Sequence, residues 1–355
     1  MMEAEEIDYE LSPDNVEECE GASFEHYRFE ADKGQAPLRV DKFLSFHMDH
    51  SSRHRIQLAI KAGYVQVNGK TVKANFVIRP GDVVSFVMPY ERRGLEILPE
   101  NIPLNIVYED EDVLVIDKPA GMVVHPGHGN YSGTLVNALA GYLGISQGPD
   151  AKDERMGVLV HRIDKDTSGL LVVAKNEEAQ LDLSHQFFEH SIERCYLAVV
   201  WGNLQEDEGT IDGNIGRDPS DRLRYKVFPE GEQGKTAVTH YKVLERLGFV
   251  TVVECRLETG RTHQIRVHMR HIGHPLFGDE RYDGKEIRQG TIYAKYRQFI
   301  ENCFKILPRQ ALHARTLGFR HPRTGAWMRF ESPVPEDMQA LLEKWRNYTK
   351  QLTEE

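Results

Sequence analysis

One junction in the sequence constrains the fold more than any other, because a polar, turn-forming stretch meets an apolar run there. Residues 161–169 read His-Arg-Ile-Asp-Lys-Asp-Thr-Ser-Gly, and residues 170–174 read Leu-Leu-Val-Val-Ala. A charged cluster directly before a short β-branched run predicts a tight loop that leads into a buried strand. Such a strand would hold the loop on a rigid scaffold.

Asp164 is the strongest candidate for a reactive group in this stretch. Its neighbours Arg162 and Lys165 can keep the carboxylate ionised. Because it lies shortly before an apolar strand, the carboxylate would also be partly desolvated. This combination suits a nucleophile or a general base. An ordinary charged turn has the same composition, so the stretch alone leaves both interpretations open.

Further motifs occur in a fixed order along the chain. They are Lys-Pro-Ala-Gly at 118–121 with His-Pro at 125–126, Arg-Cys-Tyr-Leu-Ala at 194–198, Gly-Arg-Thr-His-Gln-Ile-Arg-Val-His at 260–268, and Leu-His-Ala at 312–314. Together with residues 161–175 they resemble the motifs of the RluA-type pseudouridine synthases, RNA enzymes that isomerise uridine. The resemblance covers roughly residues 36 to 335, and several motifs in one order argue against a chance match.

The resemblance implies roles for four side chains. Asp164 would be the nucleophile, although whether it attacks the sugar or the base stays open. Tyr196 would lie against the target uracil and take up the C5 proton, and Arg261 would pair with Asp164 and keep it ionised. Arg162 would fill the space left by the extruded base. From composition alone, Tyr196 would be a core aromatic and Arg261 a surface charge.

The resemblance also implies a substrate class. The members that act on large-subunit ribosomal RNA are the most similar, so we expect that RNA as the partner, with transfer RNA as the alternative. A noncatalytic RNA-binding or ribosome-assembly protein would keep the basic residues and lose the Asp164 motif. A glycosidic hydrolase would need a second carboxyl group, for which Asp166 is available.

The charge of the chain is unevenly distributed. The net charge is -11, but residues 1–35 hold twelve Asp and Glu against two basic residues, whereas residues 36–90 hold eight Lys and Arg against three Asp. We therefore expect residues 1–35 to be an acidic, disordered tail. A basic module over residues 36–90 follows it, as expected for a part that meets RNA phosphates.

The pattern of the basic module predicts two short helices and a strand. The second helix would open at a Ser cap at 51–52, and the strand over 63–67 would turn at Asn68-Gly69. This arrangement resembles the S-four RNA-binding module, in which a helix face lies against RNA phosphates. The expected RNA-binding residues are Arg39, Lys42, Arg53, Arg55 and Lys61, although a solvated basic surface would look the same.

The catalytic domain is expected over residues 101–355, after a polar linker at 91–100. Strands are predicted at 112–117, 170–174, 196–201, 237–244, 249–257, 312–317 and 327–330, with a short strand after the loop at 118–121. Helices are predicted at 133–139, 176–190 with an Asn cap, 262–273 with a Thr cap, and 335–348, with a helical or loop insertion at 284–308. Arg266 on the third helix would face RNA. Mixed elements without regular βαβ alternation predict an α+β fold, and the resemblance implies a long central mixed sheet with flanking helices.

Several classes of protein are disfavoured. No apolar run is long enough to span a bilayer, and the N-terminus is acidic where a secretory signal is basic, so we expect a cytoplasmic protein. We also expect a monomer, although the sequence does not determine the oligomeric state. The four cysteines lie far apart, which predicts neither a disulfide framework nor a zinc site. His268, His271 and His274 recur every three residues without an accompanying thiol or carboxylate, so we expect no metal. No phosphate-binding glycine motif occurs, so we expect no nucleotide cofactor.

Overall fold

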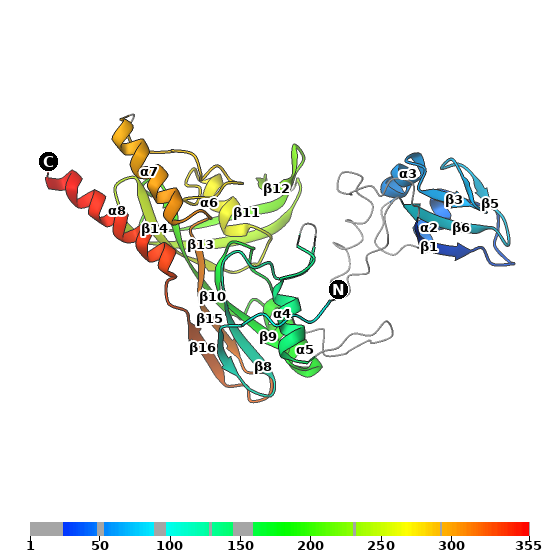
Figure 1. Ribbon diagram of the computed structural model, residues 1–355, viewed down its shortest axis with the longest axis horizontal. Helices are drawn as coiled ribbons and strands as arrows, with labels where there is room; N and C mark the ends of the chain where they lie inside the picture. The colour runs from blue at the N-terminus through cyan, green and yellow to red at the C-terminus, as the bar shows by residue number, and fades with distance from the viewer. Residues whose placement is uncertain are drawn as a thin grey trace. The chain divides into compact units, whose positions relative to one another are not determined.

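The structure, a computed structural model, divides into two compact units, residues 1–96 and 97–355 (Figure 1). It describes residues 24–47, 53–88, 97–127, 130–144, 159–229, 232–291 and 293–354. The boundary between the units falls inside the segment expected to be the linker, of which residues 91–96 lie outside the described ranges. Within these ranges, no helix is long and apolar enough to cross a membrane.

The described part of the first unit combines two helices with two small sheets. Strands β1 (Phe24–Glu30), β6 (Val83–Met88), β3 (Val65–Val67) and β4 (Lys70–Thr71) lie side by side in that order, and β2 (Leu38–Arg39) pairs with β5 (Val77–Ile78). The helices are α2 (Val40–His47) and α3 (Arg53–Lys61). The predicted turn between β3 and β4 is confirmed, because Asn68 and Gly69 both have positive φ angles, as a tight hairpin turn requires.

The expectation of a disordered tail is wrong for residues 24–31. Strand β1 pairs with β6 in antiparallel register, Tyr27 and Phe29 pack against the core, and Ala31 is only 2% exposed. The acidic composition of the first 35 residues conceals this short aromatic strand, because its core-facing residues alternate with charged ones. Residues 1–23 and the expected Ser cap at 51–52 lie outside the described ranges.

The second unit contains a long mixed sheet, as the resemblance implied, with ten strands in its described residues. Nine strands follow the order β12-β11-β13-β14-β10-β15-β9-β8-β7, and β16 pairs with β15. Only the contact between β15 and β9 is parallel. The strands are β7 (Ile106–Glu109), β8 (Val113–Lys118), β9 (Ser168–Ala174), β10 (Glu193–Trp201), β11 (Glu208–Asp218), β12 (Asp221–Phe228), β13 (Lys235–Arg246), β14 (Val250–Leu257), β15 (Leu312–Arg320) and β16 (Trp327–Glu331).

Helices cover both faces of this sheet because its central strands are apolar on both sides. On β10, Tyr196, Ala198 and Val200 pack with α4 (Leu135–Tyr142) and α6 (Gln264–His271), whereas Leu197, Val199 and Trp201 pack with α7 (Ala294–Ile306) and α8 (Glu336–Glu354). Helix α5 (Glu177–Phe188) packs against alternate residues of β8, β9 and β15. Figure 1 shows α7 and α8 side by side.

Several local predictions have clear outcomes. The Asn176 cap of α5 is confirmed, since its side chain accepts a hydrogen bond from the Ala179 N–H. The Thr262 cap is wrong, because α6 begins after His263, whose φ is 55°. No strand follows the 118–121 loop over residues 122–126. Residues 294–306 are part of the core rather than an insertion, because α7 packs against α8.

Candidate active site

Asp164 lies in the loop that leads into β9, as expected. The loop turns sharply where the Thr167 N–H donates to the Asp164 carbonyl, 3.1 Å away. Gly169 then brings β9 against β15 with a φ of 115°, and a side chain at this position would overlap the carbonyl of Ala314. Ser168 and His313 are hydrogen bonded across the same strand pair at 3.0 Å. Asp164 therefore lies just before the tightly packed parallel pairing of β9 with β15.

Two buried basic side chains hold the backbone of this loop in place. Lys118 is fully buried, and its Nζ donates to the carbonyls of Pro119, Met122 and Lys165 at 2.8, 2.8 and 3.0 Å. Burial lowers the pKa of Lys118 to about 7. Arg309 donates to the Asp166 carbonyl at 3.0 Å. The two carbonyl oxygens that follow Asp164 in the chain are thus satisfied, which restricts the movement of its carboxylate.

The side chain that pairs with Asp164 is Arg266. Its Nη1 donates to Asp164 Oδ2 at 2.8 Å, while Nε and Nη2 donate to the two oxygens of Asp279 at 2.7 and 2.9 Å. Asp279 is completely buried and also accepts from the backbone N–H groups of Arg281 and Tyr282. The Tyr282 ring lies 4.9 Å from the guanidinium carbon. Arg266 is therefore clamped in one orientation.

The structure corrects two predictions for the helix motif. The expected pairing of Arg261 with Asp164 is wrong, because the Arg261 Nε donates to the Thr236 carbonyl at 3.0 Å. Arg266 was expected to face RNA, yet it is 7% exposed and bound to two carboxylates. The reason is the helix start. Gln264 accepts from the Arg261 N–H, so Arg261 stays in the turn before α6 and Arg266 falls in the first helical turn.

Asp164 is ionised at neutral pH in this setting. Burial alone would raise its pKa, but His263 and Arg266 outweigh burial and lower the pKa below its usual value. Burial also lowers the pKa of His263 to about 4, so this ring is neutral near pH 7. Arg266 is therefore the lasting positive charge beside the carboxylate.

Tyr196 lies on β10 within the main core, 8% exposed. Burial raises its pKa, while the nearby Arg194 opposes the rise and Asp164 adds to it. Tyr196 belongs to the same hydrophobic cluster as Ile163, the residue before Asp164. The core position expected from composition is confirmed, and the contact with uracil implied by the resemblance stays a prediction.

The remaining predicted residues are distributed over both units. Arg162 is exposed, and its charge acts on Asp164. In the first unit, Lys42 and Lys61 are exposed, whereas Arg39 and Arg53 both bond to the buried Asp41. Although burial opposes it, hydrogen bonds from Gln57 and the two arginines lower the pKa of Asp41 to about 2. The side chain of Arg55 lies outside the described part of the chain.

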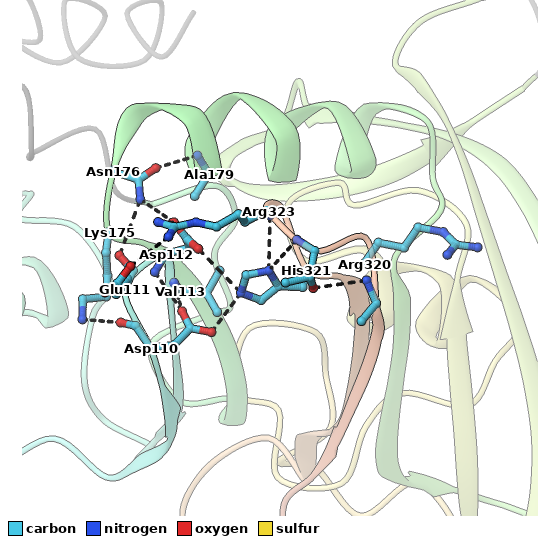
Figure 2. A network of polar contacts seen from close by, with 12 residues as sticks. Asp110, Glu111, Asp112, Val113, Lys175, Asn176, Ala179, Arg320, His321 and Arg323 are labelled. Carbon is cyan, nitrogen blue, oxygen red and sulfur yellow. Dashed lines mark hydrogen bonds and ion pairs between the residues drawn. The ribbon is translucent and has the colours of Figure 1, made fainter.

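Among the residues that the structure describes, one group of metal-binding residue types occurs, at the end of β8 and β9 away from Asp164. Ligand atoms of Asp110, Asp112 and His321 lie within 4.8 Å of one another. Figure 2 shows how these atoms are engaged. His321 Nε2 lies 2.9 Å from Asp110, and Arg323 donates to Asp112 at 2.6 Å. Asn176 also donates to Asp112. The network therefore ties the β7–β8 turn to α5 and the β15–β16 turn.

Four residues of the site were not identified from the sequence: Lys118 as a loop anchor, and His263, Asp279 and Tyr282 around Arg266. Lys118 and His263 lie inside the motifs, but their roles depend on contacts between distant segments. Asp279 follows an apolar run at 275–277, and a carboxylate after buried residues was the one available signal. No local pattern marks Tyr282.

Comparisons with known proteins agree on one family. Residues 112–271 match the RNA pseudouridylate synthase family, and residues 38–84 match the S4 domain family. The chain is 48% identical to the uncharacterized RNA pseudouridine synthase YlyB of Bacillus subtilis, covering 89% of this chain and 97% of the relative. It is 44% identical to the ribosomal large subunit pseudouridine synthase D of Pseudomonas aeruginosa, covering 86% and 91%.

A solved structure has a similar fold. Human RNA pseudouridylate synthase domain containing 4 superposes with a TM-score of 0.54 and 23% identity, covering 68% of this chain and 93% of the human chain. At this identity the likeness concerns the fold alone.

Proposed function

The chain belongs to the RNA pseudouridine synthases, which are isomerases. We propose that it converts specific uridines of large-subunit ribosomal RNA to pseudouridine, with Asp164 as its nucleophile. One observation carries the assignment to Asp164: its ionised carboxylate is held by a clamped Arg266 at the end of a rigid strand. The relatives named for the large ribosomal subunit support the choice of substrate.

The reaction requires no change in composition. The bond from the ribose C1′ to the uracil N1 breaks, the base turns, and a bond from C1′ to C5 forms. The C5 hydrogen leaves as a proton, and N1 takes up a proton. In our proposal the target nucleotide is flipped out of the RNA, Arg162 occupies its place, and Tyr196 lies against the uracil. Asp164 supplies the electron pair that permits the rearrangement.

The first unit is proposed to supply affinity. Exposed Lys42 and Lys61 can meet phosphates directly, while Arg39 and Arg53 share their charge with Asp41. Two arginines on one carboxylate leave a net positive charge, which suits RNA binding. We also propose that the protein acts as a monomer in the cytoplasm. Light scattering during gel filtration tests the monomer.

The test uses large-subunit ribosomal RNA transcribed with uridine tritiated at C5. The full-length protein should release tritium and leave the RNA mass unchanged, and Asp164→Asn should bind RNA equally well without releasing tritium. Transfer RNA serves as the competing substrate. Near-normal tritium release by Asp164→Asn would exclude its role as nucleophile, and conversion of transfer RNA alone would exclude the proposed target.

A further inference from the structure

The two oxygens of Asp164 have different surroundings. Oδ2 accepts the hydrogen bond from Arg266, whereas Oδ1 lies 3.9 Å from Nε2 of His263. The Asp164 side chain is 20% exposed and the His263 side chain is 12% exposed. Because Arg266 occupies Oδ2, Oδ1 is the oxygen that stays available to attack a substrate. The hydrogen carried by His263 therefore matters for the reactive oxygen.

The His263 ring is fixed from several sides. Its backbone is in the left-handed region, with a φ of 55°, directly before α6. The rings of Tyr225 and Tyr282 meet it edge to face, with centroids 5.6 and 5.5 Å away. A left-handed backbone is costly for histidine, and such strain persists only where the surroundings enforce it. The position of the ring is thus determined by the fold.

The hydrogen-bond network around Tyr282 determines which ring nitrogen of His263 carries the hydrogen. The Tyr282 hydroxyl is completely buried and accepts from the Tyr225 backbone N–H at 3.0 Å. Its remaining hydrogen-bonding neighbour among the described residues is His263 Nδ1, at 2.7 Å. A buried hydroxyl hydrogen requires an acceptor, and here that acceptor is Nδ1. Since an accepting Nδ1 has no hydrogen in neutral histidine, the hydrogen is on Nε2.

We infer that His263 is a positioning residue that presents an Nε2–H to the free oxygen of Asp164, and that Tyr282 enforces this tautomer. The inference rests on Asp164 being the nucleophile. At 3.9 Å the contact is longer than a hydrogen bond, so it orients Oδ1 electrostatically and leaves its lone pairs open. The opposite tautomer would place two electron pairs face to face.

Burial favours the neutral form of His263, and the charges around the ring act in opposite directions. Burial lowers its pKa to about 4, with Arg266 and Arg281 acting in the same direction and Asp164 and Asp279 opposing them. The ring therefore stays neutral over the pH range in which the enzyme can be assayed. Its influence on Asp164 comes from the hydrogen position rather than from a positive charge.

The tautomer can be measured without RNA. In the full-length protein labelled with ¹⁵N-histidine, the two ring nitrogens of His263 give distinct shifts, assigned by their loss in His263→Gln. We expect the hydrogen on Nε2 in the parent protein, and a mixture or the opposite tautomer in Tyr282→Phe. Tyr108→Phe is the matched control, because it removes a hydroxyl that bonds Asp110 in the distant network of Figure 2. A hydrogen on Nδ1 in the parent protein would overturn the inference.

Kinetics then test the consequence for catalysis. Loss of one neutral hydrogen bond predicts that Tyr282→Phe lowers kcat about 5-fold with KM unchanged. His263→Gln, which keeps an N–H at the end of the side chain, should retain more activity than His263→Leu. In the double variant, the addition of Tyr282→Phe to His263→Gln should not lower the activity further. Equal activity of His263→Leu and the parent protein would refute the role of His263. Failure of Asp164→Asn to inactivate would refute the nucleophile but leave the tautomer result intact.

Discussion

Replacement of Arg266 by methionine, with Arg261→Met as the matched control, separates the observed pairing from the one implied by the motif. Arg266→Met removes three hydrogen bonds to two carboxylates, of which Asp279 is fully buried and Asp164 is 20% exposed. Breaking a buried ion pair from one side costs about 3–5 kcal/mol. Arg261→Met removes one bond to a backbone carbonyl near the surface and should cost about 0.5 kcal/mol or less.

The effect on activity follows from the same contacts. A hydrogen bond to a charged group contributes about 1.5–3 kcal/mol, so kcat/KM of Arg266→Met should fall about 10- to 150-fold. Arg266→Lys should recover part of this loss, because lysine keeps the charge without the two-pronged geometry. Tritium release from C5-labelled RNA measures the rates, and circular dichroism selects a temperature at which each variant is folded.

The pH profile provides a second measurement. In the parent protein the pKa of Asp164 is lowered, so its carboxylate stays ionised as the pH falls toward its usual value of 3.8. Removal of the Arg266 cation and its hydrogen bond removes two of the effects that lower the pKa of Asp164 against burial, so this pKa rises and activity in Arg266→Met should begin to fall at a higher pH. If Arg261→Met is strongly impaired while Arg266→Met is active with an unchanged profile, the pairing in the working enzyme is not the one described here.

Three further predictions concern the scaffold and the RNA-binding unit. Lys118→Met removes a buried donor from three partly buried carbonyls, of which only the Lys165 carbonyl has another donor among the described residues, the Gly121 N–H, and should lower the free energy of unfolding by about 2–4 kcal/mol, measured by urea denaturation. Gly169→Ala should cost at least about 2 kcal/mol because of its positive φ and the close β15 carbonyl, whereas Gly127→Ala meets open space and should be neutral in the same assay. Charge reversal at Lys42 and Lys61 should weaken binding to long ribosomal RNA. The number of counterions released on binding, read from the slope of log affinity against log salt concentration, should fall by roughly one to two. Activity on short fragments at saturating concentration should stay unchanged.

The sequence was sufficient where the chemistry is local. Asp164 stands between cations and before a β-branched run, and both features lie within a few residues of it. The α+β class followed from strands and helices that lack regular βαβ alternation. The cap of α5 could be predicted from Asn176, because an asparagine side chain accepts a hydrogen bond from one of the free backbone N–H groups in the first turn of a helix.

The choice between Arg261 and Arg266 required tertiary information. Both arginines lie in the same motif, and Thr262 is a better capping residue than His263 on sequence preference alone. Gln264 reverses that preference, because its side chain accepts from Thr259 and from the Arg261 N–H and donates to the Val238 carbonyl. The turn before α6 is thus attached to β13, and this attachment selects the arginine that reaches Asp164.

Strands β11 and β12 escaped prediction for a different reason. Glycines at 209, 213 and 216 interrupt the apolar pattern of β11, and glycine in a strand is normally read as a break. At Gly209 a side chain would meet the ring of Tyr241 on the paired strand β13. The glycine makes room for a large cross-strand neighbour, and only knowledge of the register shows this.

The second carboxylate on Arg266 explains how Asp164 can be both oriented and reactive. A guanidinium with one carboxylate partner tends to pair bidentately and would neutralise both of its oxygens. Asp279 occupies the Nε and Nη2 edge of Arg266 and is itself fixed by two backbone N–H groups. In this arrangement Asp164 receives a single hydrogen bond from Arg266, from Nη1 to Oδ2, so Oδ1 stays open to a substrate. Because two carboxylates share one guanidinium, the three groups together carry one net negative charge.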